Sequence, residues 1–371
     1  MKLSTSKTEL QAALQKLSKA TPARSTLPIL NSVLFQVTND GVNLRATDLE
    51  ITITLPLEAS IEEVGAAAIP LSTLLDITNE LPSTRITIAV TAQNKVELRT
   101  ELGVYDLMGK SADEFPAAPD VDDSRELTIT STVIGALIDN TVFAVSKDEL
   151  KPALTGVLFQ FDAASLTAVA TDGHRLVRYI RTDYSSDDYA GNIIVPRKFL
   201  GLLSTFLSET EDIKIGISDK HLIARIDGNM IITRLIDERF PDYESVIPKD
   251  NEKRLTVDRE SILGAVRRVS IFANKSTNQV AMRLNAEKQI LTTEDPEKAS
   301  KAQEDLTASF TGEDLTIGYN ASYLKDILSH IHSDKIVIDL KTPISAGLFF
   351  PENQEENSDL TMLLMPIRLN D

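Results

Sequence analysis

The chain has 371 residues, of which 42% are apolar, and it contains no cysteine, so disulfides and thiolate metal sites are excluded. Its net charge of −17 argues against a surface that coats nucleic acid or an anionic membrane over its whole extent. The N-terminal stretch 1–6 is not an apolar signal sequence, and no run reaches the roughly 18 apolar residues of a membrane span. We therefore expect a soluble, cytoplasmic protein without a membrane partner.

The first third of the chain predicts alternating helices and strands. Leu10, Leu14 and Leu17 recur at the spacing of one helix face. Asn39–Gly41 predicts a hairpin turn, and Pro70 is suited to the first turn of a helix. The expected elements are a helix at 8–17, strands at 33–37, 42–47 and 51–55, a helix from Pro70, and strands at 86–90 and 96–99.

The same order of elements returns twice. Helices are expected near 132–143 and 197–207, with Pro196 placed like Pro70, and again near 258–272 and 321–331. The acidic stretch 352–356 has no metal-ligand spacing and predicts a solvated loop.

Sequence matches at a constant offset support this repetition. Leu34–Gln36 returns as Leu158–Gln160, and Ala46–Asp48 returns as Ala170–Asp172, each 124 positions later. Phe115–Pro116 returns at 240–241, and weaker matches lie at 261–266, 292–295 and 320–324. A unit of about 125 residues therefore occurs three times.

The predicted fold class is α+β, with three similar domains that each contain two helices and two antiparallel sheets. Polar stretches at 120–126 and 249–254 place the domains at 1–122, 127–249 and 254–371. Stacked repeats form an open solenoid or, through a heterologous contact, a closed ring. Three domains in one chain could close as a dimer of six.

Three motifs carry a family resemblance across the whole chain. The segments 23–30 (ARSTLPIL), 170–176 (ATDGHRL) and 365–369 (MPIRL) occur in order. Together with the triple repeat they resemble the bacterial DNA sliding clamp, the β subunit of the replicative DNA polymerase III. The resemblance implies a non-catalytic processivity factor: a head-to-tail homodimeric ring, with helices lining the channel, that encircles duplex DNA and slides without sequence specificity. The implied partners are a second copy of the chain, duplex DNA, the replicative polymerase, the clamp loader, repair polymerases and mismatch-repair proteins.

The resemblance also implies a groove between the second and third domains that takes short linear peptides. Aliphatic and methionine side chains suit a deformable apolar pocket, and Arg and His at its rim would fix a peptide backbone. The alternative for the end of the chain is an ordinary edge strand with a buried face. The implied groove residues are Leu154, Thr171, Gly173, His174, Arg175, Leu176, Pro241, Val246, Ile344, Leu363, Met365, Pro366, Ile367, Arg368 and Leu369.

The pair Asp172 and His174 also allows a different class of function, a hydrolase with acid–base chemistry. The repeat argues against it, because Thr-Asp or Thr-Glu recurs at the equivalent place in all three units, which favours a turn role. The two functions differ in what His174→Ala removes, a chemical activity or only peptide affinity. A clamp-like paralogue that serves as a peptide-binding scaffold stays open as a further alternative.

Basic residues on helices and loops predict weak contacts to DNA phosphates, which carry no sequence information. The resemblance favours Arg24, Arg197, Lys198 and Lys151, although the acidic neighbour Asp148 departs from the family pattern. Other basic residues on the helices are Lys7, Lys16, Lys19, Arg259, Arg267, Arg268 and Lys325.

For ring closure, the resemblance implies that Ile271 and Phe272 pack against Tyr105 and Leu107 of a second copy. Alternatively, Ile271 and Phe272 complete the core face of a helix. No phosphate-binding loop, dinucleotide turn or His-rich metal spacing occurs, so we expect no cofactor and no metal.

Overall fold

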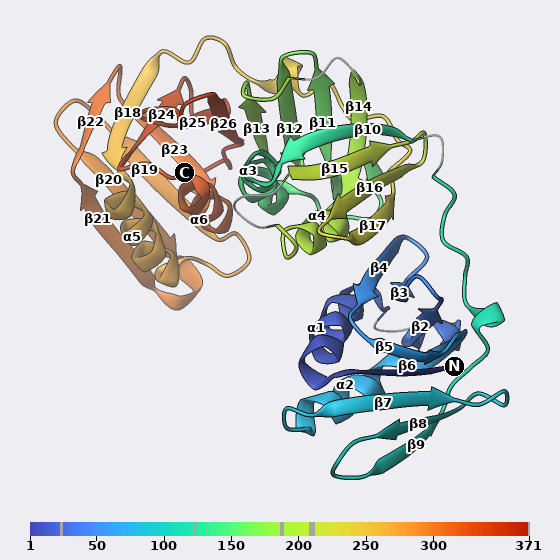
Figure 1. Cartoon of the computed structure of the whole chain (residues 1–371). Helices are drawn as coiled ribbons and strands as arrows, with labels where there is room; N and C mark the ends of the chain where they lie inside the picture. Colours follow the sequence, from blue (N-terminus) through green and yellow to red (C-terminus); the bar gives the residue numbers. More distant parts are fainter. Residues whose placement is uncertain (23–24, 122–123, 186–188, 208–211, 370–371) are drawn as a thin grey trace. The chain divides into compact units, whose positions relative to one another are not determined.

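The computed structural model describes residues 1–22, 25–121, 124–185, 189–207 and 212–369 (Figure 1). The chain divides into two compact units: the first comprises 1–131 and 202–235, the second 132–201 and 236–371. The middle repeat therefore contributes to both units, so this division differs from the expected boundaries near 122–127 and 249–254. No helix of the described residues is long and apolar enough to cross a membrane.

The first unit contains a five-stranded and an eight-stranded antiparallel sheet. The strands of the smaller sheet are, in spatial order, β5 (Ser60–Glu63), β1 (Lys2–Ser6), β7 (Arg85–Val90), β8 (Lys95–Arg99) and β9 (Val104–Met108). Those of the larger sheet are β10 (Arg125–Thr130), β15 (Asp212–Ile217), β16 (His221–Ile226), β17 (Asn229–Arg234), β4 (Ile51–Leu57), β3 (Val42–Thr47), β2 (Ser32–Val37) and β6 (Gly65–Pro70).

The second unit contains a nine-stranded and a four-stranded antiparallel sheet. The larger runs β14 (Gly191–Pro196), β11 (Gly156–Asp162), β12 (Ser165–Thr171), β13 (Arg175–Arg181), β26 (Ser358–Leu364), β25 (Gly347–Pro351), β24 (Lys335–Leu340), β18 (Lys253–Asp258) and β22 (Ala308–Thr311). The smaller runs β21 (Ser300–Leu306), β20 (Gln289–Asp295), β19 (Gln279–Leu284) and β23 (Leu315–Asn320).

In the described part of the chain six α-helices accompany these sheets, two in each repeat. In the first unit α1 and α2 lie side by side, and in the second unit α5 and α6 do so next to the four-stranded sheet (Figure 1). The helices are α1 (Lys7–Leu17), α2 (Leu71–Glu80), α3 (Ser131–Thr141), α4 (Arg197–Leu203), α5 (Arg259–Val269) and α6 (Ala321–His330).

Local sequence explains where helix α1 begins and which face it buries. The Ser6 hydroxyl accepts a hydrogen bond from the Glu9 amide at 3.1 Å, which satisfies one of the unpaired donors of the first turn. Leu10, Leu14 and Leu17 are fully buried, as their helical spacing predicts.

The sequence predictions of fold class and of six helices are confirmed, with changes at some ends. The helix expected at 197–207 ends at Leu203, and the one expected at 258–272 is α5 followed by a short 3-10 helix, Ser270–Phe272. Of the strands of the first repeat, β1, β5, β6 and β9 were not predicted. The expected two sheets per repeat are joined, because β17 pairs with β4 and β13 pairs with β26.

A tight contact inside the second unit links a glycine to a buried tyrosine. Tyr319 is fully buried, and its hydroxyl has no hydrogen-bond partner among the described residues. A Cβ at Gly347 would collide with this hydroxyl oxygen and would lie 3.0 Å from Leu340 Cδ2. The absence of a side chain at Gly347 therefore makes room for the Tyr319 ring.

We expect Gly347→Ala to lower the free energy of unfolding by about 1–3 kcal/mol, because the added methyl overpacks this position. Tyr319→Phe removes both the collision and an unsatisfied hydroxyl, so alone it should be neutral or stabilising. In the Tyr319→Phe background the cost of Gly347→Ala should shrink, and urea unfolding of the four proteins measures this coupling. Strictly additive effects would contradict the proposed contact.

Candidate functional site

The turn between β12 and β13 is fixed by two side chains. The Thr171 hydroxyl donates to the Arg175 carbonyl at 2.7 Å and accepts from the Gly173 amide at 3.1 Å. The Asp172 carboxylate accepts from the amides of His174 at 2.9 Å and Arg175 at 3.0 Å. Gly173 has a φ of 88°, a conformation that glycine adopts without a steric penalty. The turn role predicted for Thr171 and Asp172 matches this geometry.

Arg175 is a structural residue, because its side chain is enclosed and fully engaged. Its guanidinium donates to Asp172 Oδ2 at 3.1 Å, to Asp326 Oδ2 at 2.6 Å and to the Phe143 carbonyl at 2.8 Å. It also lies 4.8 Å from the centroid of the Tyr323 ring, a favourable cation–π distance. The residue is only 7% exposed, so its guanidinium supports the turn and α6, and its place at the rim of a peptide groove stays a prediction.

His174, in contrast, is exposed at the end of the turn. Its ring stacks on Tyr323 with a centroid distance of 5.8 Å, and its carbonyl accepts from the Met365 amide at 2.8 Å. The oxygens of Asp172 bind backbone amides and Arg175. Asp172 therefore holds the turn, and the hydrolase alternative lacks the carboxylate that would orient the His174 imidazole.

A buried apolar cluster lies beside this turn. Leu176 of β13 is paired with Leu363 of β26, and Leu348 of β25 is paired with Leu363 in turn. Because paired residues of adjacent strands lie on the same face, these side chains form one apolar floor. The buried members of this cluster are Leu158, Val169, Leu176, Ile194, Tyr243, Ala346, Leu348 and Leu363, with Ala153, Ile236, Phe240, Ile247 and Phe350 packed against them.

Three exposed apolar side chains surround this floor. Met365 follows β26 directly, Ile344 lies two residues before the cluster member Ala346, and the Val246 amide donates to the carbonyl of the cluster member Tyr243 at 3.3 Å. Ile344 is 67% exposed and Met365 42%. Leu154 is half-buried next to the cluster residue Ala153, and Pro241, which follows Phe240, is exposed. Flexible apolar side chains around an apolar floor suit a hydrophobic ligand.

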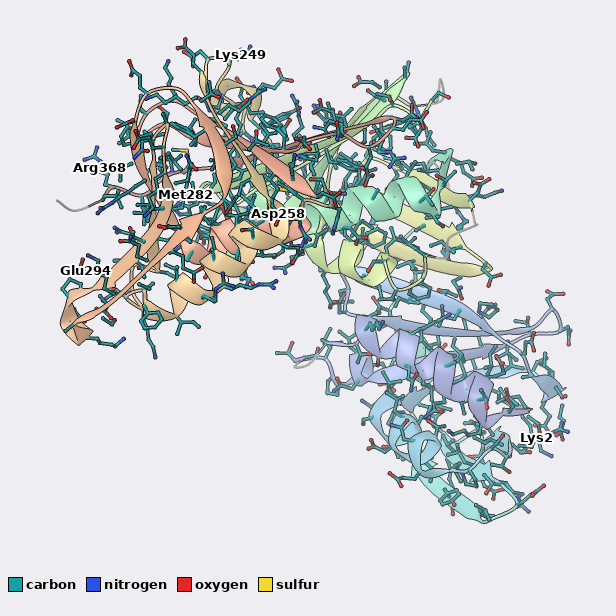
Figure 2. The ribbon with its side chains drawn as sticks, turned by 90° about the vertical axis from the view of Figure 1, so that its left-hand side faces the viewer. Lys2, Lys249, Asp258, Met282, Glu294 and Arg368 are labelled. Carbon is teal, nitrogen blue, oxygen red and sulfur yellow. The ribbon has the colours of Figure 1, made fainter. Side chains whose placement is uncertain are left out.

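The segment after β26 is anchored to the four-stranded sheet. The Ile367 amide donates to the Gly318 carbonyl at 2.9 Å, and a Cβ at Gly318 would lie 2.5 Å from Leu369 Cδ2. Ile367 and Leu369 are half-buried, as is Pro366, whereas Arg368 is exposed. Figure 2 shows Arg368 beside the sheet that contains Met282. Of the implied groove residues at the end of the chain, Leu363 thus belongs to β26 of the nine-stranded sheet, whereas Ile367 is bonded to β23 of the four-stranded sheet. This end of the chain is not a simple final strand.

Tyr323 is a site residue that the sequence analysis missed. It lies on α6, stacks on His174 and contacts Arg175. Burial and the nearby carboxylate of Asp172 raise its pKa, whereas Arg175 opposes this shift. No local pattern distinguishes Tyr323 from an ordinary helix residue, since its partners come from the middle repeat.

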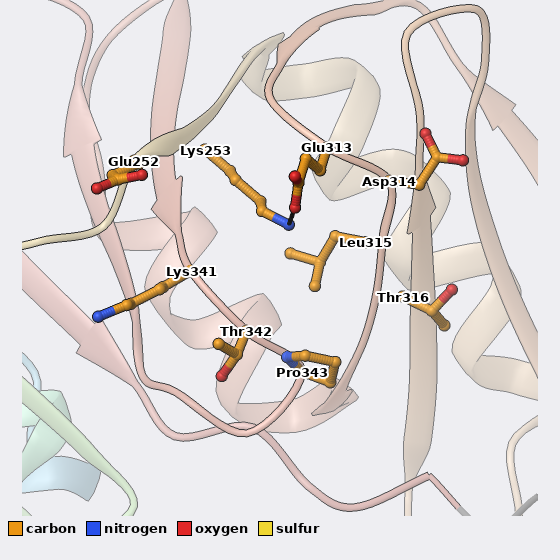
Figure 3. A pocket seen from close by; sticks show the side chains of 9 residues that line it. All are labelled: Glu252, Lys253, Glu313, Asp314, Leu315, Thr316, Lys341, Thr342 and Pro343. Atoms are coloured by element: carbon orange, nitrogen blue, oxygen red, sulfur yellow. Dashed lines mark ion pairs between the residues drawn. The ribbon is translucent and has the colours of Figure 1, made fainter.

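A separate hollow in the second unit is polar. Figure 3 shows that Lys253 points toward Glu313, with the Nζ and carboxylate oxygen 3.7 Å apart, and that Lys341 and Thr342 line the opposite side. Lys341 is in turn paired with Asp250. Since both lysines are neutralised by carboxylates, this hollow offers less to a charged ligand than the apolar floor offers to a hydrophobic one.

The candidate DNA-contacting residues are exposed where the structure describes them. Lys151, Arg197 and Lys198 have exposed side chains, and Arg24 lies outside the described residues. Several other cations on the helices are engaged within the protein. Arg259 donates to the carbonyls of Leu328 and Ser329, and Arg268 forms a two-pronged ion pair with Glu304 at 2.7 and 2.9 Å.

The candidate dimer residues lie at two sheet edges or near them. Tyr105 and Leu107 belong to β9, the last strand of the five-stranded sheet, and both are half-buried. Ile271 and Phe272 follow α5 in the second unit and are 77% and 45% exposed. The alternative that Ile271 and Phe272 complete a helix's core face does not fit this exposure.

We expect Arg175→Ala to lower the free energy of unfolding by about 3–5 kcal/mol, because it leaves a largely buried carboxylate at Asp172 without its cation. Arg178→Ala is the matched control, since Arg178 is paired with Asp359 at a more exposed place and should cost at most about 1 kcal/mol. Urea unfolding of both variants tests this difference. Equal costs would show that the Arg175 network is no stronger than a surface ion pair.

The comparisons with known proteins agree along the whole chain. Three family profiles match, described as the N-terminal, central and C-terminal domains of the DNA polymerase III beta subunit, over residues 1–119, 128–242 and 244–368. Among curated relatives, the Beta sliding clamp of Vibrio cholerae is 29% identical and that of Bacillus subtilis 28%. The first alignment covers 100% of both chains, and the second covers 99% of this chain and 100% of the relative.

Solved structures give the same result. A DnaN sliding clamp from Bartonella birtlesii bound to griselimycin matches with a TM-score of 0.94 and 30% identity, and the Bacillus subtilis sliding clamp matches with 0.94 and 28%, each over 100% of both chains. From the three matched domains, the apolar floor with its exposed rim, and this full-length similarity, we conclude that the chain belongs to the family of the DNA polymerase III beta subunit, the non-catalytic sliding clamp that serves as a polymerase processivity factor.

Proposed function

We propose that this chain acts as a homodimeric ring that encircles duplex DNA and tethers its partners through the groove over the apolar floor. The observation that carries the proposal is the combination of a buried floor, Leu176 and Leu363, with the exposed apolar side chains of Ile344 and Met365. Exposed apolar groups around a preformed floor are costly in water unless a ligand covers them. The partners would include the replicative polymerase, the clamp loader, repair polymerases and mismatch-repair proteins.

The groove would take a short linear peptide, with aliphatic or aromatic side chains inserted over Leu176 and Leu363. Thr171 and Gly173 fix the turn at one side, and Arg175 acts through that turn and α6 without touching the peptide. His174, exposed beside Met365, is available for a polar contact with the peptide backbone. Pro241, Val246 and Leu154 would form the far side.

Ring closure would use the edge of the five-stranded sheet of one copy and the edge of the four-stranded sheet of the other. β9 and β21 are both edge strands, with unpaired backbone groups available to another chain. Ile271 would then pack against Tyr105 and Leu107 of the second copy. A heterologous contact of this kind closes into a ring when the rotation permits.

Contacts to DNA would be few, through Arg24, Lys151, Arg197 and Lys198. Since Arg268 and Arg259 are engaged within the protein, retention on DNA would come from topological linkage, which keeps a partner at high effective concentration near its site. A peptide-binding paralogue without a role in replication would lack this linkage and would not be retained on circular DNA after loading.

A labelled peptide ending in Gln-Leu-Ser-Leu-Phe should bind the full chain with micromolar affinity, about −8 kcal/mol. Met365→Ala should weaken binding roughly tenfold, because it removes one apolar wall, about 1–3 kcal/mol of contact. Fluorescence anisotropy measures this, with Leu150→Ala as the control, since Leu150 is an exposed apolar residue that is not among the proposed groove residues. Absence of binding to the folded wild type, or equal loss in both variants, would refute the groove assignment.

Ile271→Asp should convert the dimer to monomers, because a charge would be buried in the proposed interface without a partner. Analytical ultracentrifugation at several concentrations measures the shift, and Leu150→Asp, an equal change at another exposed apolar residue, should leave the dimer intact. A wild type that sediments only as a monomer, or a variant that remains dimeric, would rule out this interface.

A further inference from the structure

A row of side chains crosses one face of the eight-stranded sheet in the first unit. Arg45 of β3 is paired with Thr54 of β4, which is paired with Met230 of β17. Met230 is paired with Arg225 of β16, and Arg225 with Lys214 of β15. Paired residues lie on the same face, and strands are about 4.8 Å apart. Arg225 and Lys214 are therefore direct neighbours, and Arg45 lies about 14 Å from Arg225 across three strand spacings. We call these five residues the basic row.

The charges of the basic row are incompletely neutralised. Arg45 is half-buried, and its Nε donates only to the Thr54 hydroxyl at 3.3 Å, with no carboxylate in ion-pair distance among the described residues. Burial without a carboxylate lowers the pKa of Arg45. Arg225 and Lys214 share a single carboxylate, that of Glu126, at 3.5 and 3.4 Å. Among the described ion pairs, the three cations of the row thus share one carboxylate, although the whole chain has a net charge of −17.

The corresponding face of the nine-stranded sheet has a different chemistry. There Val169 takes the place of Arg45, since Val169 is paired with Leu158 as Arg45 is paired with Leu34. Two arginines on that face are each matched by an aspartate, Arg178 by Asp359 and Arg254 by Asp339. The same arrangement of paired strands therefore carries an apolar floor in the second unit and incompletely neutralised positive charge in the first.

The turn that flanks the proposed groove is also repeated in the first unit. Thr47 donates to the Ile51 carbonyl at 2.9 Å, and the Asp48 carboxylate accepts from the amides of Glu50 and Ile51 at 3.0 and 2.7 Å. The Arg234 amide donates to the Glu50 carbonyl at 3.0 Å, as the Met365 amide does to His174. A turn with the same backbone hydrogen bonds therefore lies at the end of β3 in the first unit and at the end of β12 in the second. In the first unit the residue bonded to this turn is a cation, Arg234.

We propose that the basic row is a second docking surface, which binds a short acidic peptide segment of a partner protein. Thr54 and Met230, both half-buried, offer a weakly polar centre for one aliphatic side chain. Carboxylates on either side would reach Arg45 in one direction and Arg225 with Lys214 in the other. Single-stranded nucleic acid fits less well, because the row contains no aromatic ring on which unpaired bases could stack.

The test is fluorescence anisotropy of the full chain with the labelled peptide Asp-Glu-Asp-Leu-Asp-Glu-Asp, at about 0.1 M salt, where exposed charges act over about 10 Å. Arg45→Gln should weaken binding roughly tenfold, the loss of one charge-assisted hydrogen bond. Arg283→Gln is the matched control, since it removes the same charge from an exposed arginine of β19, and it should leave affinity unchanged. Urea unfolding verifies that both variants are folded.

Two further peptide measurements separate binding at the basic row from binding in the groove and from binding to the peptide backbone alone. The uncharged peptide Asn-Gln-Asn-Leu-Asn-Gln-Asn should not bind, and Met365→Ala should leave the affinity for the acidic peptide unchanged while it weakens binding of the groove peptide. If the groove peptide fails to bind the wild type, the measurement with the acidic peptide can therefore still be interpreted. The proposal is overturned if the acidic peptide does not bind, if Arg283→Gln weakens it as much as Arg45→Gln, or if a single-stranded dT oligonucleotide binds more tightly with the same dependence on Arg45.

Discussion

The backbone pairing of β13 with β26 is the constraint on which the candidate site depends. It joins strands from the middle and last repeats in one register, with Leu176 opposite Leu363 and Arg175 opposite Leu364. A shift by one residue would move every apolar side chain to the other face, and the floor would disappear. Main-chain hydrogen bonds thus determine where the chemistry lies, and the segment after β26 then continues along Gly318.

An equivalent strand pairing occurs in the first unit, so two sheets with similar backbones carry different side chains. β17 with β4 repeats the geometry of β26 with β13, and the turns that follow Thr47 and Thr171 have matching hydrogen bonds. One position shows the divergence, since Leu49 stands where Gly173 stands in the middle repeat. Leu49 has a φ of 78°, which is unfavourable for a bulky residue, and it is 53% exposed. The two turns therefore share their backbone hydrogen bonds but differ in the side chains that they carry.

Sequence patterns predict the elements that depend on near neighbours. The helix at Leu10, Leu14 and Leu17, the turn before Gly41 and the repeat at Thr47 and Thr171 all follow from spacing within one segment. The enclosure of Arg175 does not, because its partners Phe143 and Asp326 lie 32 and 151 positions away. The pairing of strands from different repeats does not follow from spacing either. The alternation of apolar and polar residues predicts a strand, but it does not say which strand of another repeat will pair with it.

The distribution of charge is consistent with a protein that holds DNA mainly by enclosure. Tight phosphate contacts would slow sliding, because each one displaces counterions and adds to affinity. In this chain Arg268 is bound by Glu304, and Arg259 by backbone carbonyls, so neither guanidinium is fully available to a phosphate. In the first unit, the half-buried Arg45 has no carboxylate within ion-pair distance among the described residues, and Arg225 shares Glu126 with Lys214. The proposed docking of acidic segments at the basic row would therefore be separate from the enclosure that retains DNA.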